Sequence, residues 1–405
     1  MNILLLCASW NNRGDESAIR AMIDELKILY PNAEFTFLVT REMPQFPYEN
    51  DSRVNVAVIH PHTKRTYLDI PFLLLSKGRF ALTPGMRSAI RTIKKADLVL
   101  HAPGGPTMGE VYPYMQFNAF FNFFIARANG IPYGFYAPSM GPFNSKFKNF
   151  LRKKIYNSAQ FIATREPISA EYAKKLELKK DIIVTMDSAI QHKFDPEKYE
   201  NQLDEYKALK DFLAEHKKAV GITITHLQWN SKYSSRPEMA ENIEKTFKQT
   251  IQYLTSNGYG VIFIPQLFGK DNDYDYMNGF MTQNCFIIDD KHDCYFQQHI
   301  ISKLHFVIGM RYHSNIFSAK MKTPFIAIPY EQKMSGFAKM IEMDKYCVDI
   351  ETLSGENVIS KINELEQNYD NVKQHLSDIN EDMVNRSYQT TLLVKQCIEK
   401  NNLNK

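Results

Sequence analysis

The chain has 405 residues, of which 44% are hydrophobic and 23% are charged, as in a soluble globular protein with room for two domains. The formal charge of +4 comes from 49 basic and 45 acidic residues spread along the chain, which argues against nucleic acid as a partner. No apolar run reaches the roughly 18 residues of a membrane span. The five cysteines lack metal-ligand spacing, and the first residues resemble a strand rather than a signal peptide. We therefore expect a reduced, cytoplasmic protein.

Short apolar segments alternate with helical patterns along most of the chain, which predicts parallel sheets with helices on both faces. In the first half we predict strands at Ile3–Cys7, Glu34–Val39, Val54–Val58, Leu98–His101, Tyr133–Ala137, Phe161–Thr164 and Ile182–Met186. In the second half we predict strands at Ala219–Thr225, Val261–Pro265, Phe286–Ile288, Phe306–Gly309, Phe325–Pro329 and Tyr346–Val348.

A polar segment with a proline, near Asp195, separates the two series. We expect an α/β protein with two doubly wound Rossmann-like domains facing each other across a cleft, because each domain then places its strand carboxyl ends at the cleft. The predicted domains are residues 1–195 and residues 196–370. A helical segment, residues 371–405, follows and can pack back on the first domain.

The first strand-to-helix junction contains Gly14 and Asp15. It lacks the G-x-G-x-x-G fingerprint and the P-loop lysine, so neither NAD nor ATP is indicated. Gly14 permits a tight turn. Asp15 has two interpretations, namely a cap of the helix that follows and a catalytic carboxylate at the mouth of the cleft.

Two further loops contain glycines after predicted strands. Gly104 and Gly105 follow the strand at Leu98–His101, and Gly141 follows the strand at Tyr133–Ala137. Such glycines allow a ligand to approach the backbone closely, or they make an ordinary turn.

Charged residues also follow strands. Arg165 lies between a predicted strand and a helix, where an arginine is usually a solvated ion-pair partner. Asp187 ends the next predicted strand, where it could orient that arginine or cap the following segment.

The segment Gly309–Ser314 is the most informative stretch. It places Arg311 and His313 between a buried strand and a helix for which Ser314 is a candidate N-cap, and Lys333 follows the next strand. The start of a helix, two cations and a titratable donor at neighbouring strand ends predict a site for a small, doubly anionic substrate.

Basic residues interleaved with apolar ones form two further groups. A solvated helix face is one interpretation, and peripheral contact with anionic lipid at the inner face of the membrane is the other. The groups are Lys77, Arg79, Arg87, Arg91, Lys94 and Lys95, then Lys146, Lys148, Arg152, Lys153 and Lys154.

In this order, the motifs resemble the polysaccharide pyruvyl transferase family. The matching elements are Asn12 to Glu16, Gly104-Gly105, Gly141-Pro142, Arg165 with Ser169, Asp187, Gly309 to Ser314, and Pro324 through Tyr330 to Lys333. The family's glycine loop often carries a third glycine, whereas Pro106 follows Gly105 here.

The resemblance implies a fold like that of the GT-B glycosyltransferases. It also implies transfer of pyruvate from phosphoenolpyruvate to a sugar of a polysaccharide or glycan precursor, free or lipid-linked, with formation of a cyclic ketal. Carried over by position, Arg165, Arg311, Ser314 and Lys333 bind the donor. His313 and Asp15 handle protons, in roles that can be exchanged, and we expect them in different domains. No cofactor and no metal are expected.

Two alternatives remain at this point. A nucleotide-sugar glycosyltransferase of the same architecture would need a carboxylate for ribose after the phosphate loop, and Glu331 lies within the lysine motif instead. A non-catalytic glycan-binding relative would be expected to lose Arg311 or His313, and both are present.

Overall fold

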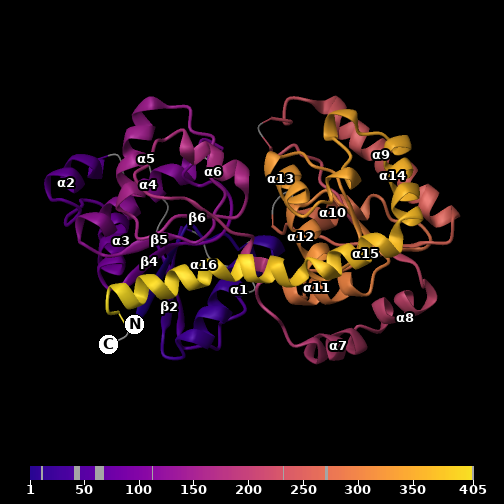
Figure 1. The fold of residues 1–405 in the computed structure, drawn as a ribbon, viewed down its shortest axis with the longest axis horizontal. Coiled ribbons are helices and arrows are strands. Elements are labelled where there is room, and N and C mark those ends of the chain that lie inside the picture. Colours follow the sequence, from indigo (N-terminus) through magenta and orange to yellow (C-terminus); the bar gives the residue numbers. More distant parts are fainter. Residues whose placement is uncertain are drawn as a thin grey trace. The chain divides into compact units, whose positions relative to one another are not determined.

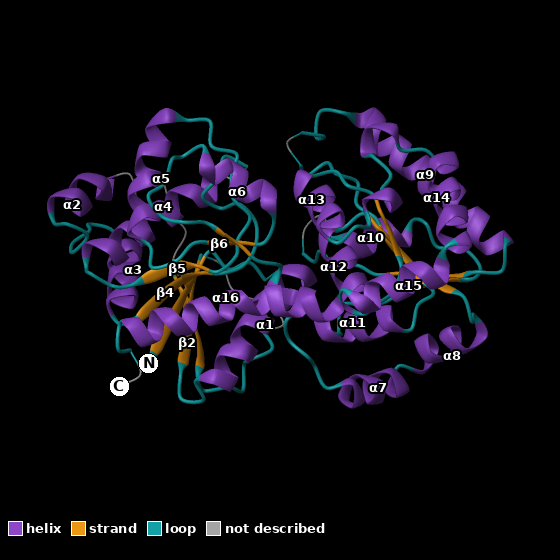
Figure 2. Ribbon diagram, viewed as in Figure 1, coloured by secondary structure: helices purple, strands orange, loops and turns teal. Residues whose placement is uncertain are grey.

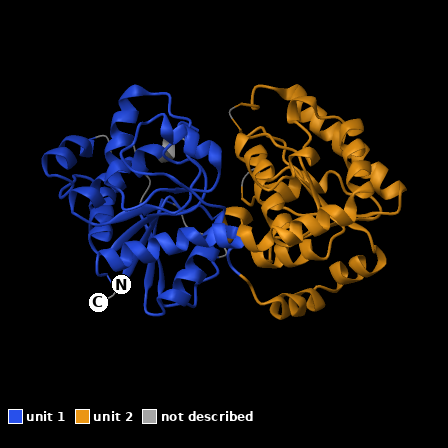
Figure 3. Ribbon diagram, viewed as in Figure 1, with its two compact units in different colours: residues 1–10, 18–192, 384–405 blue, residues 11–17, 193–383 orange. Residues whose placement is uncertain are grey.

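A computed structural model describes residues 1–10, 12–40, 46–59, 68–111, 113–230, 232–269 and 272–403, without the side chains of residues 113–115. The chain forms two compact units (Figure 3). Unit 1 comprises residues 1–10, 18–192 and 384–405, and unit 2 comprises residues 11–17 and 193–383. The main boundary, near residue 193, lies close to the predicted one. Residues 384–405 group with unit 1, the unit on which the last segment was expected to pack, whereas residues 11–17 group with unit 2.

Unit 1 is built on a parallel sheet with strand order β3-β2-β1-β4-β5, the arrangement of a doubly wound domain (Figure 2). Its strands are β1 (Asn2–Leu6), β2 (Glu34–Val39), β3 (Val54–Val58), β4 (Leu98–His101) and β5 (Tyr133–Phe135). A second sheet pairs β6 (Ala163–Thr164) with β7 (Ile183–Val184). The helices are α1 (Arg13–Leu29), α2 (Asp69–Leu75), α3 (Pro84–Lys94), α4 (Pro113–Ala128), α5 (Lys146–Ser158), α6 (Pro167–Lys174) and the short η2 (Ser188–Ile190).

Alternating residues of β1 point into two separate cores, which assigns the helices to the two faces of the sheet. Leu4 and Leu6 pack with apolar residues of α2, α3, α4 and α5. Ile3 and Leu5 pack with apolar residues of α1 and of α16 (Asn380–Lys400). The last helix of the chain is thus part of the unit 1 core, where Ser387 Oγ donates to Asp187 O at 2.7 Å.

Unit 2 repeats the same topology, with strand order β10-β9-β8-β11-β12. Its helices are labelled in Figure 1. Its strands are β8 (Ala219–Thr223), β9 (Gly260–Phe263), β10 (Cys285–Ile287), β11 (Phe306–Gly309) and β12 (Phe325–Ala327). The helices are α7 (Pro196–Glu205), α8 (Lys207–Glu215), α9 (Pro237–Ser256), α10 (Asp273–Asn278), α11 (Cys294–Ser302), α12 (Tyr312–Lys320), α13 (Gln332–Met340), α14 (Gly355–Gln367) and α15 (Tyr369–Asp378), with short turns η3 (Asp344–Tyr346) and η4 (Ile350–Thr352).

One predicted strand and one predicted surface residue are wrong. The predicted strand Tyr346–Val348 is the end of η3 followed by a single parallel bridge between Cys347 and Ala327, too short to form a strand. Arg152 is not part of a basic surface, because its side chain is fully buried and Nε donates to Met108 O at 2.9 Å. Among the described helices, none is long and apolar enough to cross a bilayer.

Candidate functional site

The best candidate site in unit 2 lies at the carboxyl ends of β8 and β11, where the strand order of the sheet reverses. Thr223 ends β8, and its Oγ1 accepts from Met310 N at 3.0 Å and from Arg311 N at 3.1 Å. These bonds fix the loop between β11 and α12. Ligands of doubly wound sheets bind at such a reversal, so the loop that carries Arg311 and His313 is well placed for binding.

Arg311 is buried and paired with a carboxylate that the sequence did not single out. Its Nε donates to Asp273 Oδ2 at 3.1 Å, and its Nη2 donates to Oδ1 of the same side chain. Burial disfavours the charge of Arg311, but Asp273 and Tyr330 outweigh that effect, so the pKa of the guanidinium is raised. Asp273 also accepts from the backbone N–H of Gln266 and of Leu267. Arg311 is therefore a rigid cation whose charge is partly balanced.

His313 lies in the first turn of α12 and packs against the amino-terminal segment of the chain. A Cβ at Gly14 would lie 1.9 Å from His313 Nδ1 and 2.1 Å from its Cγ. Only a glycine at residue 14 allows this contact. Gly14 therefore serves the close approach of the imidazole, and Asp15 directly follows it in the chain.

The segment that carries Gly14 is held in unit 2 by several bonds. Arg13 N donates to Gln266 O at 2.8 Å, and the guanidinium of Arg13 donates to Glu16 and to Asp290 O, each at 2.7 Å. Gln298 also donates to Ser17 Oγ at 2.7 Å. Asp15 and His313 were expected in different domains, but both belong to unit 2. Asn11, in the same loop, lies outside the described residues.

Asp15 does not cap α1. Asn12 precedes the helix, and its Oδ1 accepts from Gly14 N at 2.7 Å while its carbonyl accepts from Glu16 N at 2.9 Å. Asp15 lies within the first turn and is partly exposed. The capping role thus belongs to Asn12, and Asp15 is available for another role.

Ser314 is not the N-cap of α12, as the sequence predicted. The helix begins at Tyr312 and its N-cap is Arg311, without a capping side chain. Ser314 is fully buried, where its hydroxyl donates to Arg311 O at 2.7 Å and contacts Thr223 Oγ1 at 2.9 Å. Ser314 therefore stabilises the loop between β11 and α12 through its buried hydroxyl.

Lys333 lies beside the start of α12, as the sequence predicted for a cluster with Arg311 and His313. Its Nζ lies 5.6 Å from the ring centre of Tyr312, the residue before His313. It also forms an ion pair of 2.7 Å with Glu331 Oε2, with both side chains about one-fifth exposed (17% and 22%). Glu331, weighed earlier as a ribose ligand, is thus the partner of this lysine.

The site residues predicted in unit 1 form a second, separate network. Arg165 is buried, donating to Asp187 Oδ2 at 2.7 Å and to Ser139 Oγ at 3.0 Å. Glu166 Oε2 lies 3.4 Å from Arg165 Nε. Asp187 Oδ1 also accepts from Ala189 N at 2.9 Å and caps η2. Asp187 therefore both orients Arg165 and caps the following segment. Ser139 and Glu166, the other partners of Arg165, were not singled out from the sequence.

The glycine loops join this network. Gly104 O accepts from Ser139 N at 2.9 Å, and Gly105 O accepts from Thr107 N at 2.8 Å. Gly141 has φ of +81°, and a Cβ there would lie 2.5 Å from Cγ of Tyr172. A glycine is thus required at residue 141 by backbone conformation and by packing alike.

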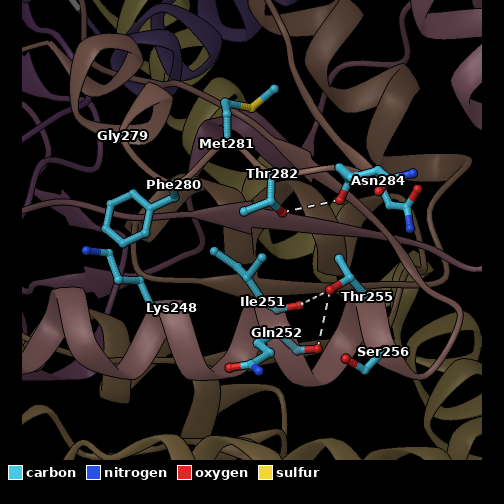
Figure 4. Close-up of a pocket in the computed structure, with 11 residues that line it drawn as sticks. Lys248, Ile251, Gln252, Thr255, Ser256, Gly279, Phe280, Met281, Thr282 and Asn284 are labelled. Atoms are coloured by element: carbon cyan, nitrogen blue, oxygen red, sulfur yellow. Dashed lines mark hydrogen bonds between the residues drawn. The ribbon is translucent and has the colours of Figure 1, made fainter.

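Neither a metal-binding cluster nor the cavity beside α9 offers a better candidate site in the described part of unit 2. No group of three or more His, Cys, Asp or Glu side chains that could hold a metal ion occurs among the described residues. A cavity of about 520 Å³ lies between α9 and the loop before β10 (Figure 4). That loop meets the amino-terminal edge of the sheet, away from α12, and the Thr255 hydroxyl there bonds within its own helix.

Comparison with known proteins agrees with these features. Residues 12–332 match the polysaccharide pyruvyl transferase family. This protein belongs to that family. The matched stretch includes Asn12 to Glu16 and Gly309 to Ser314, and it ends one residue before Lys333. The protein is also 21% identical, over 406 residues, to the amylovoran biosynthesis protein AmsJ of Erwinia amylovora, a match that covers 90% of this chain and 92% of that protein.

Solved structures with the GT-B fold resemble the whole chain. UDP-GlcNAc 2-epimerase from Neisseria meningitidis, bound to UDP-GlcNAc, has a TM-score of 0.60 and 13% identity, covering 98% of this chain and 100% of that one. The MnaA–UDP structure from S. aureus has a TM-score of 0.61 and 13% identity, with coverages of 99% and 97%. At these identities the likeness shows a shared GT-B fold, as predicted.

Proposed function

We propose that this protein transfers pyruvate from phosphoenolpyruvate to a sugar of a polysaccharide or glycan precursor and forms a cyclic pyruvate ketal. Family membership supports a pyruvyl transferase acting in polysaccharide biosynthesis. The similarity to AmsJ, a protein named for amylovoran biosynthesis, supports a polysaccharide acceptor. The observation that carries the donor assignment is that Lys333 Nζ lies 5.6 Å from the ring centre of Tyr312, the residue between Arg311 and His313.

The charges of this cluster suit the binding of a dianion, because Lys333 can exchange its carboxylate partner for an oxyanion of the donor. Arg311 is fixed by its bonds to Asp273, whereas Lys333 is partly exposed and forms an ion pair with Glu331. Phosphoenolpyruvate carries a phosphate and a carboxylate, both of which bind cations and free N–H groups at the start of a helix. We propose that Arg311 and the first turn of α12 bind one oxyanion, and that Lys333 leaves Glu331 to bind the other.

The reaction needs one proton donor and one proton acceptor. Protonation of the C3 methylene makes C2 electrophilic, and a sugar hydroxyl attacks C2 while its proton passes to a base. The C2–O bond to phosphate then breaks, a second hydroxyl of the same sugar attacks C2, and its proton leaves with the phosphate. The products are the ketal and inorganic phosphate. We assign His313 and Asp15 to these two proton transfers.

Arg165 and Ser314 were also predicted to contact the donor. Arg165 has Asp187, Glu166 and Ser139 as partners, and Ser314 lies under the α12 loop. Their contact with the donor stays a prediction, and the proposed site does not depend on it. Because cations are already present for the donor's charges, turnover should persist in excess chelator.

The proposal is tested by incubating the protein with phosphoenolpyruvate and a panel of glycans, including lipid-linked ones. Release of inorganic phosphate that depends on both substrates, together with acid-labile pyruvate on the glycan, is the expected result. The His313→Ala variant serves as the inactive control, and Lys361→Ala, which removes an ordinary surface cation, serves as the active one.

A glycosyltransferase of the same fold would behave differently in two measurements. Calorimetric titration should show binding of phosphoenolpyruvate and weaker binding of nucleotide sugars. Tighter binding of a nucleotide sugar, or release of a nucleotide upon addition of acceptor, would exclude the proposed donor.

A further inference from the structure

The outer face of α2 and α3 in unit 1 has an unusual distribution of apolar side chains. In α2 the outward stripe is Leu68, Phe72 and Leu75, which are 60%, 38% and 85% exposed. The opposite, buried stripe contains Asp69 and Leu73. A surface helix normally turns its apolar stripe to the core and its polar stripe to water. The arrangement in α2 is the reverse, so this face is built to contact something apolar.

The loop after α2 extends the apolar face. Phe80 is 47% exposed, and its ring centre lies 6.1 Å from that of Phe72 in an edge-to-face arrangement. Ser76 Oγ accepts from Phe80 N at 2.9 Å and holds the turn. Leu82 is exposed as well. The Phe72–Phe80 contact therefore joins the exposed apolar side chains of α2 to those of this loop.

Within residues 68–96 the exposed charged side chains are all positive, and Asp97 is the exposed acidic residue that follows. On α3 the cations recur at helical spacing on the side opposite the buried Met86, Ala89, Ile90 and Ile93. The acidic residue of the segment 68–96 is Asp69, which is buried and accepts from Thr83 N and Leu82 N. The exposed cations are Lys77, Arg79, Arg87, Arg91, Lys94 and Lys95.

Among the described residues, exposed large hydrophobic side chains lie mostly in unit 1. In unit 2, the large hydrophobic side chain exposed to a comparable degree is Met281, at 36%. The neighbouring α5 exposes Phe147 and Phe150, but Arg152 there is buried and Lys153 pairs with Glu177 at 2.9 Å. We use the name α2–α3 face for the exposed apolar side chains and the six exposed cations on α2, α3 and the loop between them.

We propose that the α2–α3 face docks on a bilayer that contains anionic phospholipid. Exposed leucine and phenylalanine side chains would enter the headgroup–acyl boundary, while lysine and arginine side chains would meet lipid phosphates. A second copy of this chain is a poorer occupant, because pairing this face with itself brings six exposed cations against six, and residues 68–96 offer no exposed carboxylate to balance them. The inference does not rest on the proposed reaction.

Vesicle flotation tests the proposal directly. The intact protein is mixed with phosphatidylcholine vesicles, or with vesicles that also contain phosphatidylglycerol, at low and high salt. We expect binding to the anionic vesicles that weakens with salt, and little binding to the neutral ones. The triple variant Arg87→Gln/Arg91→Gln/Lys94→Gln should bind roughly tenfold or more weakly.

Matched variants show whether binding depends on the α2–α3 face or only on the total charge and exposed apolar surface of the protein. Lys210→Gln/Lys245→Gln/Lys248→Gln removes the same charge from unit 2, and Met281→Ser removes an exposed apolar side chain there; both should bind like the wild type. Leu75→Ser/Phe80→Ser should bind more weakly. Equal binding by all variants, or no binding of the wild type to anionic vesicles, would overturn the proposal.

Sedimentation velocity addresses the competing occupant. A wild-type dimer that becomes a monomer in Leu75→Ser/Phe80→Ser would assign the face to self-association instead of lipid. A monomer in all variants, with unchanged melting temperatures, combined with loss of vesicle binding, would support the lipid assignment.

Discussion

Gly14 and His313 are separated by 299 positions in the sequence, yet a Cβ on Gly14 would lie 1.9 Å from Nδ1 of the His313 ring. The start of α1 therefore contributes to the same site as the first turn of α12. Arg13 donates hydrogen bonds to Glu16 and to Asp290 O, and these bonds hold the start of α1 in place. Asp15 and His313 thus share unit 2, whereas the sequence predicted them in different domains.

Replacing Gly14 by alanine should displace the imidazole of His313. The added methyl cannot fit at 1.9 Å, so we expect roughly 10²-fold lower kcat and a loss of about 1–3 kcal/mol of unfolding free energy from overpacking. Both quantities are measured on one preparation. Gly279→Ala, whose Cβ would meet one backbone oxygen at 3.3 Å, is the control.

A double variant shows whether Gly14 acts through His313. If it does, adding Gly14→Ala to His313→Ala should lower kcat little further, because the group that it displaces is already gone. Multiplicative losses would mean that Gly14 affects turnover by another route.

Asp15 and Asn12 should separate catalysis from capping. Asn12→Ala removes the acceptor for Gly14 N and should cost about 1 kcal/mol of stability with nearly normal turnover. Asp15→Ala should leave stability almost unchanged and lower kcat roughly 10²-fold. An Asp15→Ala enzyme with normal kcat would remove Asp15 from the proton-transfer step.

The sequence predicts the fold well, because the strands are short apolar runs that can be recognised from neighbouring residues alone. The residues after β11 were placed correctly for the same reason, since Arg311 and His313 follow a buried strand. Asp273 could not be found this way. It lies in a charged, polar stretch, and its burial depends on Arg311, which is 38 residues away and meets it only once the sheet is formed. The exchange of residues 11–17 between units also leaves no local pattern.

The Arg311–Asp273 pair should be essential for the fold of the site. Asp273→Asn leaves a buried guanidinium without its counter-charge, which should cost about 3–5 kcal/mol of unfolding free energy. Chemical denaturation measures this loss. Glu351→Gln breaks the exposed pair with Arg236 and should have no measurable effect. If the two variants were equally stable, the buried pair would not have the structural role inferred here.

The Lys333–Glu331 pair should respond in opposite directions to its two substitutions. Lys333→Ala should weaken phosphoenolpyruvate binding roughly tenfold or more, because a charged hydrogen bond is lost. Glu331→Gln should strengthen binding, because the lysine no longer has a competing carboxylate. Calorimetry gives both dissociation constants, with Lys361→Ala, from the exposed pair with Glu364, as the control. Weaker donor binding by Glu331→Gln would contradict the proposed exchange of partners.

Stability in acid should depend on His101, a buried residue at the end of β4. Its ring contacts Thr107 Oγ1 at 2.5 Å and Ala102 O at 2.7 Å. Burial lowers the pKa of His101 from about 6.5 to about 4. Between these pH values the unfolded chain takes up a proton that the folded protein does not. The unfolding free energy should therefore fall by up to about 1.4 kcal/mol per pH unit as pH decreases from 6.5 to 4, then level off.

The His101→Gln variant cannot take up that proton, so its unfolding free energy should fall less steeply over the same pH range. Other histidines with lowered pKa, namely His292, His299 and His305, are unchanged in the variant and cancel in the difference between the two curves. Denaturation at a series of pH values measures both curves. Parallel curves for wild type and variant between pH 6.5 and 4 would contradict this prediction. They would mean that His101 takes up its proton as readily in the folded protein as in the unfolded chain, although its side chain is buried.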